Sequence, residues 1–164
     1  MSEVLTFEEV LERAAQSRVI NIDAEGAVLG RLATYVAKLL LMGYTVNVVN
    51  VEKAVVTGDK KMVIESYKLW LEVRTHKNPY RHAPRRPRNP IHIFKKAVKG
   101  MLPKENWRGF KAYRRLKAYV GVPEELKGKE FVKIEDTLTD KLKRLETVTI
   151  AEIAKSMGWK GVGL

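Results

Sequence analysis

The residues best suited to chemistry in this 164-residue chain are cations concentrated in one stretch. Residues 74–117 hold 15 Lys or Arg and a single acid, Glu105, whereas the whole chain has 31 basic and 19 acidic residues. The net charge of +12 therefore belongs to this stretch, because the rest of the chain is close to neutral. Fifteen cations with so few carboxylates nearby need an external counter-charge, and a phosphate-rich partner supplies it.

Aromatic residues are interleaved with these charges, at Tyr80, Phe94, Trp107, Phe110, Tyr113 and Tyr119. Aromatic rings stack on bases that are splayed out of a helix, so the combination favours RNA as the partner. We expect affinity to come mainly from contacts with phosphates and specificity to come from RNA shape and unstacked bases.

The arginines of the proline-rich part are the first candidates for RNA contacts, because guanidinium pairs with phosphate in a bidentate way and stacks on bases. The lysines that follow are expected to be simple phosphate partners. The expected RNA-binding residues are Arg74, Lys77, Arg81, His82, Arg85, Arg86, Arg88, Lys95, Lys96, Lys99, Lys104, Arg108, Lys111 and Arg115.

The histidines do not predict a metal site. His76, His82 and His92 are six and ten residues apart, which matches no common ligand spacing, and the chain has no cysteine to support them. We expect neither a metal nor a cofactor, and we assign these histidines to RNA contact or packing. The lack of cysteine also excludes disulfides and thiol catalysis.

Two segments suggest other functions. Residues 26–31 (GAVLGR) follow a predicted strand and open a helix, where a phosphate could bind, but their glycine spacing fits neither the dinucleotide fingerprint nor the Walker loop. A tight turn is the preferred interpretation. Residues 149–161 are similar to the start of a DNA-binding helix-turn-helix, although the three residues that follow are too few for a recognition helix.

No nucleophile signature and no placed carboxylate pair predicts a catalytic site. The alternative function from another class is a nucleic-acid-modifying enzyme, which would need a pocket at the strand ends with a perturbed carboxylate or a cofactor. A DNA-binding regulator is the third hypothesis.

Length and composition predict one folded domain, because 164 residues with 45% hydrophobic content suffice for a sizeable core. The acidic N-terminal sequence is not typical of a secretory signal. The longest apolar run near residue 40, LLLM, is too short to span a bilayer. We expect a soluble intracellular protein with no membrane partner and no small-molecule substrate.

The first half of the chain predicts an α/β fold. Residues 18–23 and 45–49 are typical of buried strands, and the helix over 29–42 between them makes a βαβ unit with parallel strands. Residues 54–56 predict a third strand. Thr6 and Glu9 form a capping box that opens a helix to residue 16. The broad apolar arc of a helix over 60–74 predicts deep burial.

The basic stretch is expected to lie between that helix and a fourth strand at 117–121. Four prolines in residues 75–90 exclude helix there and favour an extended path. Asn89 and Pro90 are typical of the cap and first residue of the next helix. A shorter helix follows over 107–116. Later in the chain, Thr149 and Glu152 form a second capping box, and the helix that they open ends at Gly158.

Three groups of residues indicate a family. Asp23 followed by LGRLA at 29–33 is similar to its opening signature, and VTGDK at 56–60 is similar to its second. The third group is VKGMLP at 98–103, Arg108-Gly109 and LKAYVG at 116–121. In this order and at these separations they resemble universal ribosomal protein thirteen of the large subunit, in its archaeal and eukaryotic form, over about residues 18–125.

The resemblance implies a three-layer α/β/α domain with a mostly parallel four-stranded sheet. From the residue patterns we expect in addition a basic helical and extended insertion before the last strand and a short helical C-terminal extension. It also implies binding to large-subunit ribosomal RNA and neighbouring ribosomal proteins, a role in subunit assembly, a cytoplasmic location in the large subunit, and no catalysis. We expect one domain over 1–164, made of an N-terminal helix (1–17), an α/β core (18–121) that includes the basic segment 74–117, and the extension 122–164.

Overall fold

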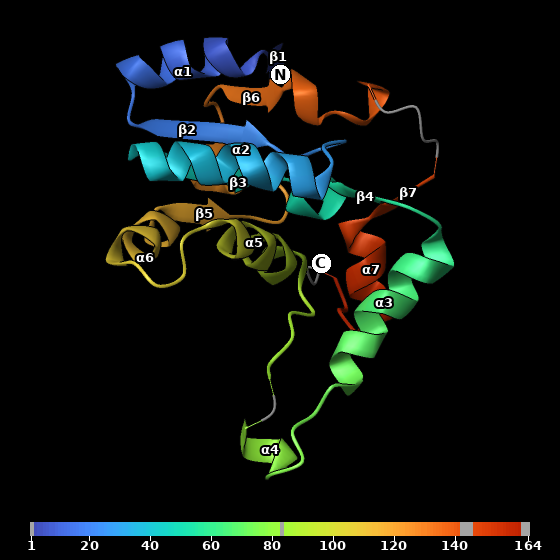
Figure 1. Ribbon diagram of the computed structural model, residues 1–164. Coiled ribbons are helices and arrows are strands. Elements are labelled where there is room, and N and C mark those ends of the chain that lie inside the picture. The colour runs from blue at the N-terminus through green and yellow to red at the C-terminus, as the bar shows by residue number, and fades with distance from the viewer. Residues whose placement is uncertain (1, 83, 142–145, 162–164) are drawn as a thin grey trace.

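The computed structural model describes residues 2–82, 84–141 and 146–161. Its central sheet has five parallel strands in the order β1-β6-β2-β3-β5 (Figure 1). Their bounds are β1 (Ser2–Leu5), β2 (Val19–Asp23), β3 (Thr45–Val49), β5 (Leu116–Ala118) and β6 (Phe131–Ile134). A separate antiparallel pair is formed by β4 (Val55–Thr57) and β7 (Thr147–Thr149).

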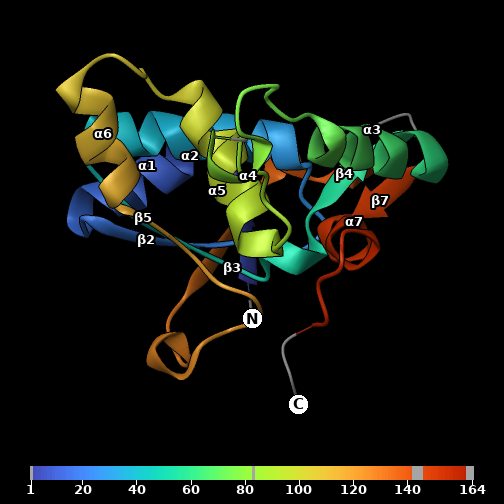
Figure 2. The same cartoon turned by 90° about the horizontal axis from the view of Figure 1, so that it is seen from below.

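The α-helices are α1 (Phe7–Gln16), α2 (Leu29–Met42), α3 (Lys60–Glu72), α4 (Pro79–His82), α5 (Pro90–Met101), α6 (Trp107–Arg114) and α7 (Ile150–Ser156). Short 3₁₀ turns are η1 (Val51–Lys53), η2 (Glu124–Leu126), η3 (Glu135–Thr137) and η4 (Thr139–Lys141). The long helices α2 and α5 and the shorter α6 lie on one side of the strands in Figure 2, and the return from β5 to β6 through η2 lies on the other. The expected α/β fold class is confirmed.

The predicted βαβ unit is the centre of the fold. β2 and β3 are parallel, with Ile22 opposite Val48, and both strands are buried on most positions. Strands covered on both faces read as almost continuous apolar runs, which is why these two were visible in the sequence. α2 buries Leu32, Val36 and Leu40 against them, and Gly43 ends the helix with φ +106°.

The four-strand prediction is wrong, because β1 and β6 were expected to lie outside the core. β1 pairs with β6 along its whole length, and Val132 of β6 pairs with Ile22 of β2. Each strand has only four residues, SEVL and FVKI, and neither has the regular alternation or the long apolar run that makes a strand distinctive. These two segments are strands because they pair with each other although they are far apart in the sequence. The α/β sheet therefore extends beyond residues 18–121.

The placement of the predicted strand at 54–56 is also wrong. β4 does not join the central sheet, and it pairs with β7 in register Val55 to Thr149. Ile150, which follows β7, donates its backbone N–H to the carbonyl of Ala54 at 2.8 Å. A short apolar run predicts a buried strand, but it does not say which sheet the strand joins.

Local signals at helix starts are confirmed. The Thr6–Glu9 and Thr149–Glu152 capping boxes both form, each with its two reciprocal hydrogen bonds. The side chain of Asn89 accepts a hydrogen bond from the backbone N–H of Ile91 at 3.1 Å, with Pro90 at the first helical position. These caps depend only on neighbouring residues, which explains why the sequence predicted them.

The prediction that prolines exclude helix from residues 75–90 is wrong at α4. Pro79 stands at the first position of a single helical turn, where the missing N–H of proline carries no penalty. Asn78, with φ +51°, caps this turn by accepting a hydrogen bond from the backbone N–H of Arg81 at 3.2 Å. The rest of the segment is irregular, as expected.

The predicted deep burial of α3 is wrong. None of its residues is buried, and Trp70 is 50% exposed while Met62 is 71% exposed. One side of α3 packs against α7 and β7 (Figure 1), and an ion pair of 2.7 Å between Lys60 and Glu152 joins α3 to α7. A broad apolar arc measures how much apolar surface a helix has, not whether its own chain covers that surface.

The contrast between Phe94 and Trp70 gives a stability prediction. Phe94 is fully buried in the core, so Phe94→Ala should lower the free energy of unfolding by about 3–5 kcal/mol through a cavity. Trp70→Ala should lower it by about 1 kcal/mol or less, because half of this side chain already contacts solvent. Denaturant unfolding of both variants measures the difference. Equal losses would show that α3 is packed as tightly as α5.

Candidate nucleic-acid interface

Six of the fourteen expected RNA-binding residues meet at one open groove between two parts of the basic segment. The irregular stretch 85–89 forms one side, and α5 with the turn after it forms the other. The groove has a volume of about 920 Å³ and is lined by Arg85, Arg86, Pro87, Arg88, Asn89, His92, Lys96, Lys99, Gly100, Lys104 and Tyr113. We call it the basic groove. Six of its lining residues, Arg85, Arg86, Arg88, Lys96, Lys99 and Lys104, belong to the predicted set.

Core packing determines which way the cations of α5 point. Ile93, Phe94 and Val98 are buried, and α5 packs against α2. Lys96 and Lys99 are exposed and lie on the groove side. Because side chains three and four residues apart share a helix face, burial of one stripe orients the other. The Asn89 cap then determines where the irregular stretch meets the helix.

No cation of residues 74–117 forms an ion pair within the described part of the chain. The ion pairs found there use Arg13, Lys53, Lys60, Lys127 and Lys133 instead. Lys99 lies over the ring of Tyr113, with 5.8 Å between its Nζ and the ring centroid. Partial burial raises the pKa of the Tyr113 phenol above its ordinary value of 10.0. The groove therefore presents positive charge that the protein itself does not neutralise.

A second group of predicted residues lies on an arm that extends from the body. Arg74, Lys77, Arg81 and His82 lie on this arm, are all exposed, and do not line the basic groove. The arm carries α4 and projects away from the sheet (Figure 1). Tyr80 on the same arm is 92% exposed. These side chains could reach RNA that lies outside the groove.

The residues predicted near α6 divide into two kinds. Arg115 is partly buried and donates to the carbonyl oxygen of Leu40 at 2.6 Å, and Arg108 donates to that of Leu41 at 3.5 Å. Both arginines therefore satisfy carbonyls at the C-terminal end of α2, where positive charge is favourable. Lys111 is exposed. Lys95 lies on α5, partly buried and outside the groove lining.

The aromatic residues also divide. Phe94 is fully buried, so the expectation that its ring stacks on RNA is wrong; helical spacing places it on the core face of α5. Trp107 and Phe110 are 65% and 50% exposed and stack on each other with ring centroids 5.2 Å apart. The guanidinium of Arg114 lies 5.2 Å from the Phe110 ring centroid. Phe110 thus contacts both Trp107 and Arg114, and the more exposed Trp107 is the ring that a base could stack on.

Sequence reasoning missed Trp70 and Asn89 as parts of the site. It named Tyr113 as a possible stacking ring and assigned His92 to RNA contact or packing, without placing either of them in a groove. Tyr113 comes from α6 and Trp70 from α3, and only the tertiary structure brings them beside α5 and Arg86.

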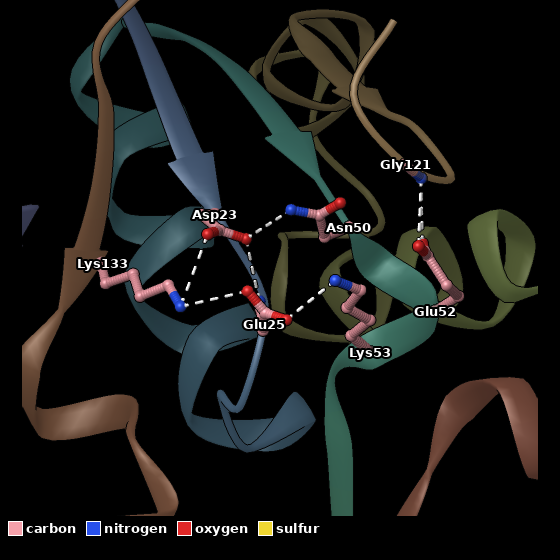
Figure 3. Close-up of polar contacts among 7 residues, drawn as sticks. All are labelled: Asp23, Glu25, Asn50, Glu52, Lys53, Gly121 and Lys133. Carbon is pink, nitrogen blue, oxygen red and sulfur yellow. Dashed lines mark hydrogen bonds and ion pairs between the residues drawn. The ribbon is translucent and has the colours of Figure 1, made fainter. Parts of the chain in front are cut away.

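The strand ends hold a carboxylate cluster that bears on the enzyme hypothesis. Figure 3 shows Asp23, at the end of β2, accepting hydrogen bonds from the Asn50 side chain at 2.9 Å and the Glu25 backbone N–H at 3.1 Å. The Lys133 ammonium lies 3.5 Å away. Burial raises the pKa of Asp23, but these hydrogen bonds and the lysine outweigh it and hold the pKa below its ordinary value. The ionised Asp23 carboxylate therefore holds Asn50, Glu25 and Lys133 together at the strand ends, and we call these contacts the Asp23 clamp.

The same cluster ties down the end of the basic segment. Both carboxylate oxygens of Glu52 accept from the backbone N–H of Gly121 at 3.1 Å, just beyond β5 (Figure 3). Lys53 pairs with Glu25 at 2.8 Å. Each of these contacts joins parts of the fold, and none of them is aimed at an external group.

Residues 26–31 form the expected turn. Val28 donates its backbone N–H to the carbonyl of Thr137 at 2.8 Å, and Thr139 donates to Gly26 at 3.2 Å, so the η3 segment lies against this turn. Across the described residues, no three His, Asp or Glu side chains come together as a metal site would require. None of the helices described is both long enough and apolar enough to cross a bilayer.

Comparison with known proteins decides the family. A family model described as "Ribosomal protein L13" matches residues 17–125, which include the basic groove. The chain belongs to this family. The match agrees with the resemblance over 18–125 and confirms it.

Relatives in the L13 family cover most of the chain. A "Large ribosomal subunit protein uL13" from Saccharolobus solfataricus is 48% identical over 146 residues, which is 89% of this chain and 97% of the relative. Proteins of the same name from Archaeoglobus fulgidus (50% over 143 residues, 86% and 88%) and Aeropyrum pernix (46% over 153 residues, 93% and 97%) are also similar.

The lowered pKa of Asp23 gives a pH prediction. The unfolded chain binds this proton at a higher pH than the folded protein does, so the clamp contributes stability above the ordinary pKa of 3.8 and loses it on acidification. Asp23→Asn should cost about 1–3 kcal/mol at pH 7. Its deficit relative to the unsubstituted protein should shrink as the pH falls from about 5 toward 2.

Chemical unfolding across that pH range measures the effect. Glu12→Gln, an exposed change on α1, serves as the control and should follow the unsubstituted protein at every pH. A deficit for Asp23→Asn that stays constant with pH would contradict the clamp.

Proposed function

We propose that this L13-family protein is a structural constituent of the large ribosomal subunit that binds large-subunit ribosomal RNA and supports RNA folding and subunit assembly. The observation that carries the proposal is the basic groove, where six predicted cations meet without a carboxylate partner in the described chain. Family membership and the uL13 relatives support the same conclusion. Neighbouring large-subunit proteins are further partners, and the place of action is the large subunit in the cytoplasm.

The α/β body acts as a rigid support for the groove. α5, one wall of the groove, is held by the core, and β5 beyond it is held by β3, so this wall is formed before RNA arrives. Pre-ordering reduces the conformational entropy that binding must remove. Phosphates entering the groove release their condensed counterions, which is the main source of affinity for such an interface.

The proposed function needs no catalysis, cofactor or small-molecule substrate. The perturbed carboxylate at the strand ends, Asp23, is engaged by Asn50, Glu25 and Lys133, which supports a role in holding the fold together. Specificity would then come from RNA shape and from bases that leave the helix, because an A-form major groove is too narrow for side chains to read.

Neutralising the groove should weaken RNA binding and reduce its salt dependence. The combined change Arg85→Ala, Arg88→Ala, Lys99→Ala and Lys104→Ala removes four cations from one lining. If each neutralises one phosphate, the slope of log K against log salt should become shallower by about 3–4. Titration of large-subunit ribosomal RNA at several salt concentrations measures this slope.

A variant with the same charge change elsewhere serves as the control. Arg18→Ala, Lys61→Ala, Lys127→Ala and Lys129→Ala also remove four exposed cations, but none of these residues lines the groove. This control should keep most of the slope. Equal effects of the two variants would mean that net charge alone, without the groove, accounts for binding.

The identity of the RNA needs a separate experiment. Crosslinking in cells, followed by sequencing of the RNA attached to this protein, should recover large-subunit ribosomal RNA. Recovery of messenger or transfer RNA in its place would overturn the proposed function.

A further inference from the structure

A second cavity opens beside the basic groove, and the proposed phosphate contacts do not use it. It has a volume of about 310 Å³ and lies between α3, α5 and the residue after α7. Its walls are mainly apolar, with Tyr67 and Trp70 from α3, Ile93 and Ala97 from α5, and Met157. We call it the apolar pocket.

The apolar pocket and the basic groove share a wall. Arg86, Pro87, Lys96 and Gly100 line both of them. A ligand with a charged part in the groove can therefore place an attached apolar part in the adjoining pocket. At Gly100 the shared wall has no side chain, and no atom lies within 4 Å of where a Cβ would be, so there is open space at this position.

The pocket presents surfaces that suit a flat aromatic ligand. Trp70 is 50% exposed, and the Arg86 guanidinium carbon lies 5.2 Å from the centroid of its ring. Both groups are planar and stack well on bases. The Nε of Arg86 is buried and has no hydrogen-bond partner in the described chain, which is costly for a charged donor. A ligand acceptor, with a small shift of this side chain, would satisfy it.

We propose that the apolar pocket receives one unpaired nucleobase of the RNA whose backbone follows the basic groove. This inference rests on the proposed function, since it names what the same RNA places beside its phosphates. The base would stack on Trp70, and its ring nitrogen or carbonyl acceptors would face Arg86. Tyr67, Ile93 and Met157 would form the apolar surroundings.

A base fits this site better than an apolar side chain from a neighbouring protein. The rim carries Arg86 and Lys96, and burying an aliphatic group beside two unpaired cations would desolvate them without compensation. A base arrives with its own phosphate as counter-charge and with acceptors for the guanidinium. The four residues shared with the groove place those two parts of a nucleotide side by side.

Binding of Trp70 variants to large-subunit ribosomal RNA tests the inference. Trp70→Ala should weaken binding by on the order of tenfold, because one stacked base is lost. The salt slope should not change, since no phosphate contact is removed. Trp70→Phe keeps a ring and should retain most of the affinity. Ultraviolet crosslinking of the unsubstituted protein should join one unpaired nucleotide to the peptide that carries Tyr67 and Trp70.

Leu69→Ala is the matched control, because Leu69 is the next residue on α3, is 62% exposed and does not line the pocket. It should bind RNA as the unsubstituted protein does. Thermal unfolding of each variant verifies that the fold is kept. An unsubstituted protein that fails to bind this RNA would overturn the proposed function itself.

Two outcomes would overturn the pocket assignment and leave the groove intact. The first is groove-dependent binding in which Trp70→Ala keeps full affinity and no crosslink maps to α3. The second is a Trp70→Ala defect that appears only when other large-subunit proteins are present, since the pocket would then hold a protein side chain.

Discussion

The packing of α5 against α2 is the interaction on which the rest of the site depends. Phe94 and Val98 are fully buried at this contact, and the Asn89 cap sets where the helix begins. Because that stripe is buried, Lys96 and Lys99 lie on the exposed face of α5, where they line the groove. A cation cluster assembled this way needs no carboxylate to position it, because apolar burial supplies the free energy that overcomes like-charge repulsion.

The two ends of the basic segment are held differently. β5 pairs with β3 inside the sheet, and Glu52 fixes the backbone just beyond it. At the other end, α3 has no buried residue, and Arg74, Lys77, Tyr80, Arg81 and His82 on the arm after it are exposed. The C-terminal end of the basic segment is therefore held by the sheet, while α3 and the arm at its N-terminal end carry exposed apolar and charged side chains. Exposed apolar surface of this kind is typical of a region that a binding partner covers.

The L13-family chain also uses arginine in two distinct ways. Arg115 and Arg108 donate to the last carbonyls of α2, where backbone acceptors would otherwise lack partners. Arg85 and Arg88 make no such contact and line the groove. The same residue type in the same basic stretch thus stabilises the fold at one place and lines an open groove at another, and composition does not distinguish the two places.

Features that depend on near neighbours or on simple composition could be predicted from the amino-acid sequence. These are the concentration of charge in residues 74–117, the caps at Thr6, Asn89 and Thr149, the central βαβ unit and the family, because each needs only local spacing or a count. Other features became visible in the folded chain alone: the pairing of β1 with β6, the exposure of α3, the burial of the Phe94 ring and the contact of Trp70 with Arg86. These features depend on contacts between residues far apart in the chain, and the free energy of such a contact is set by which surfaces the whole fold brings together.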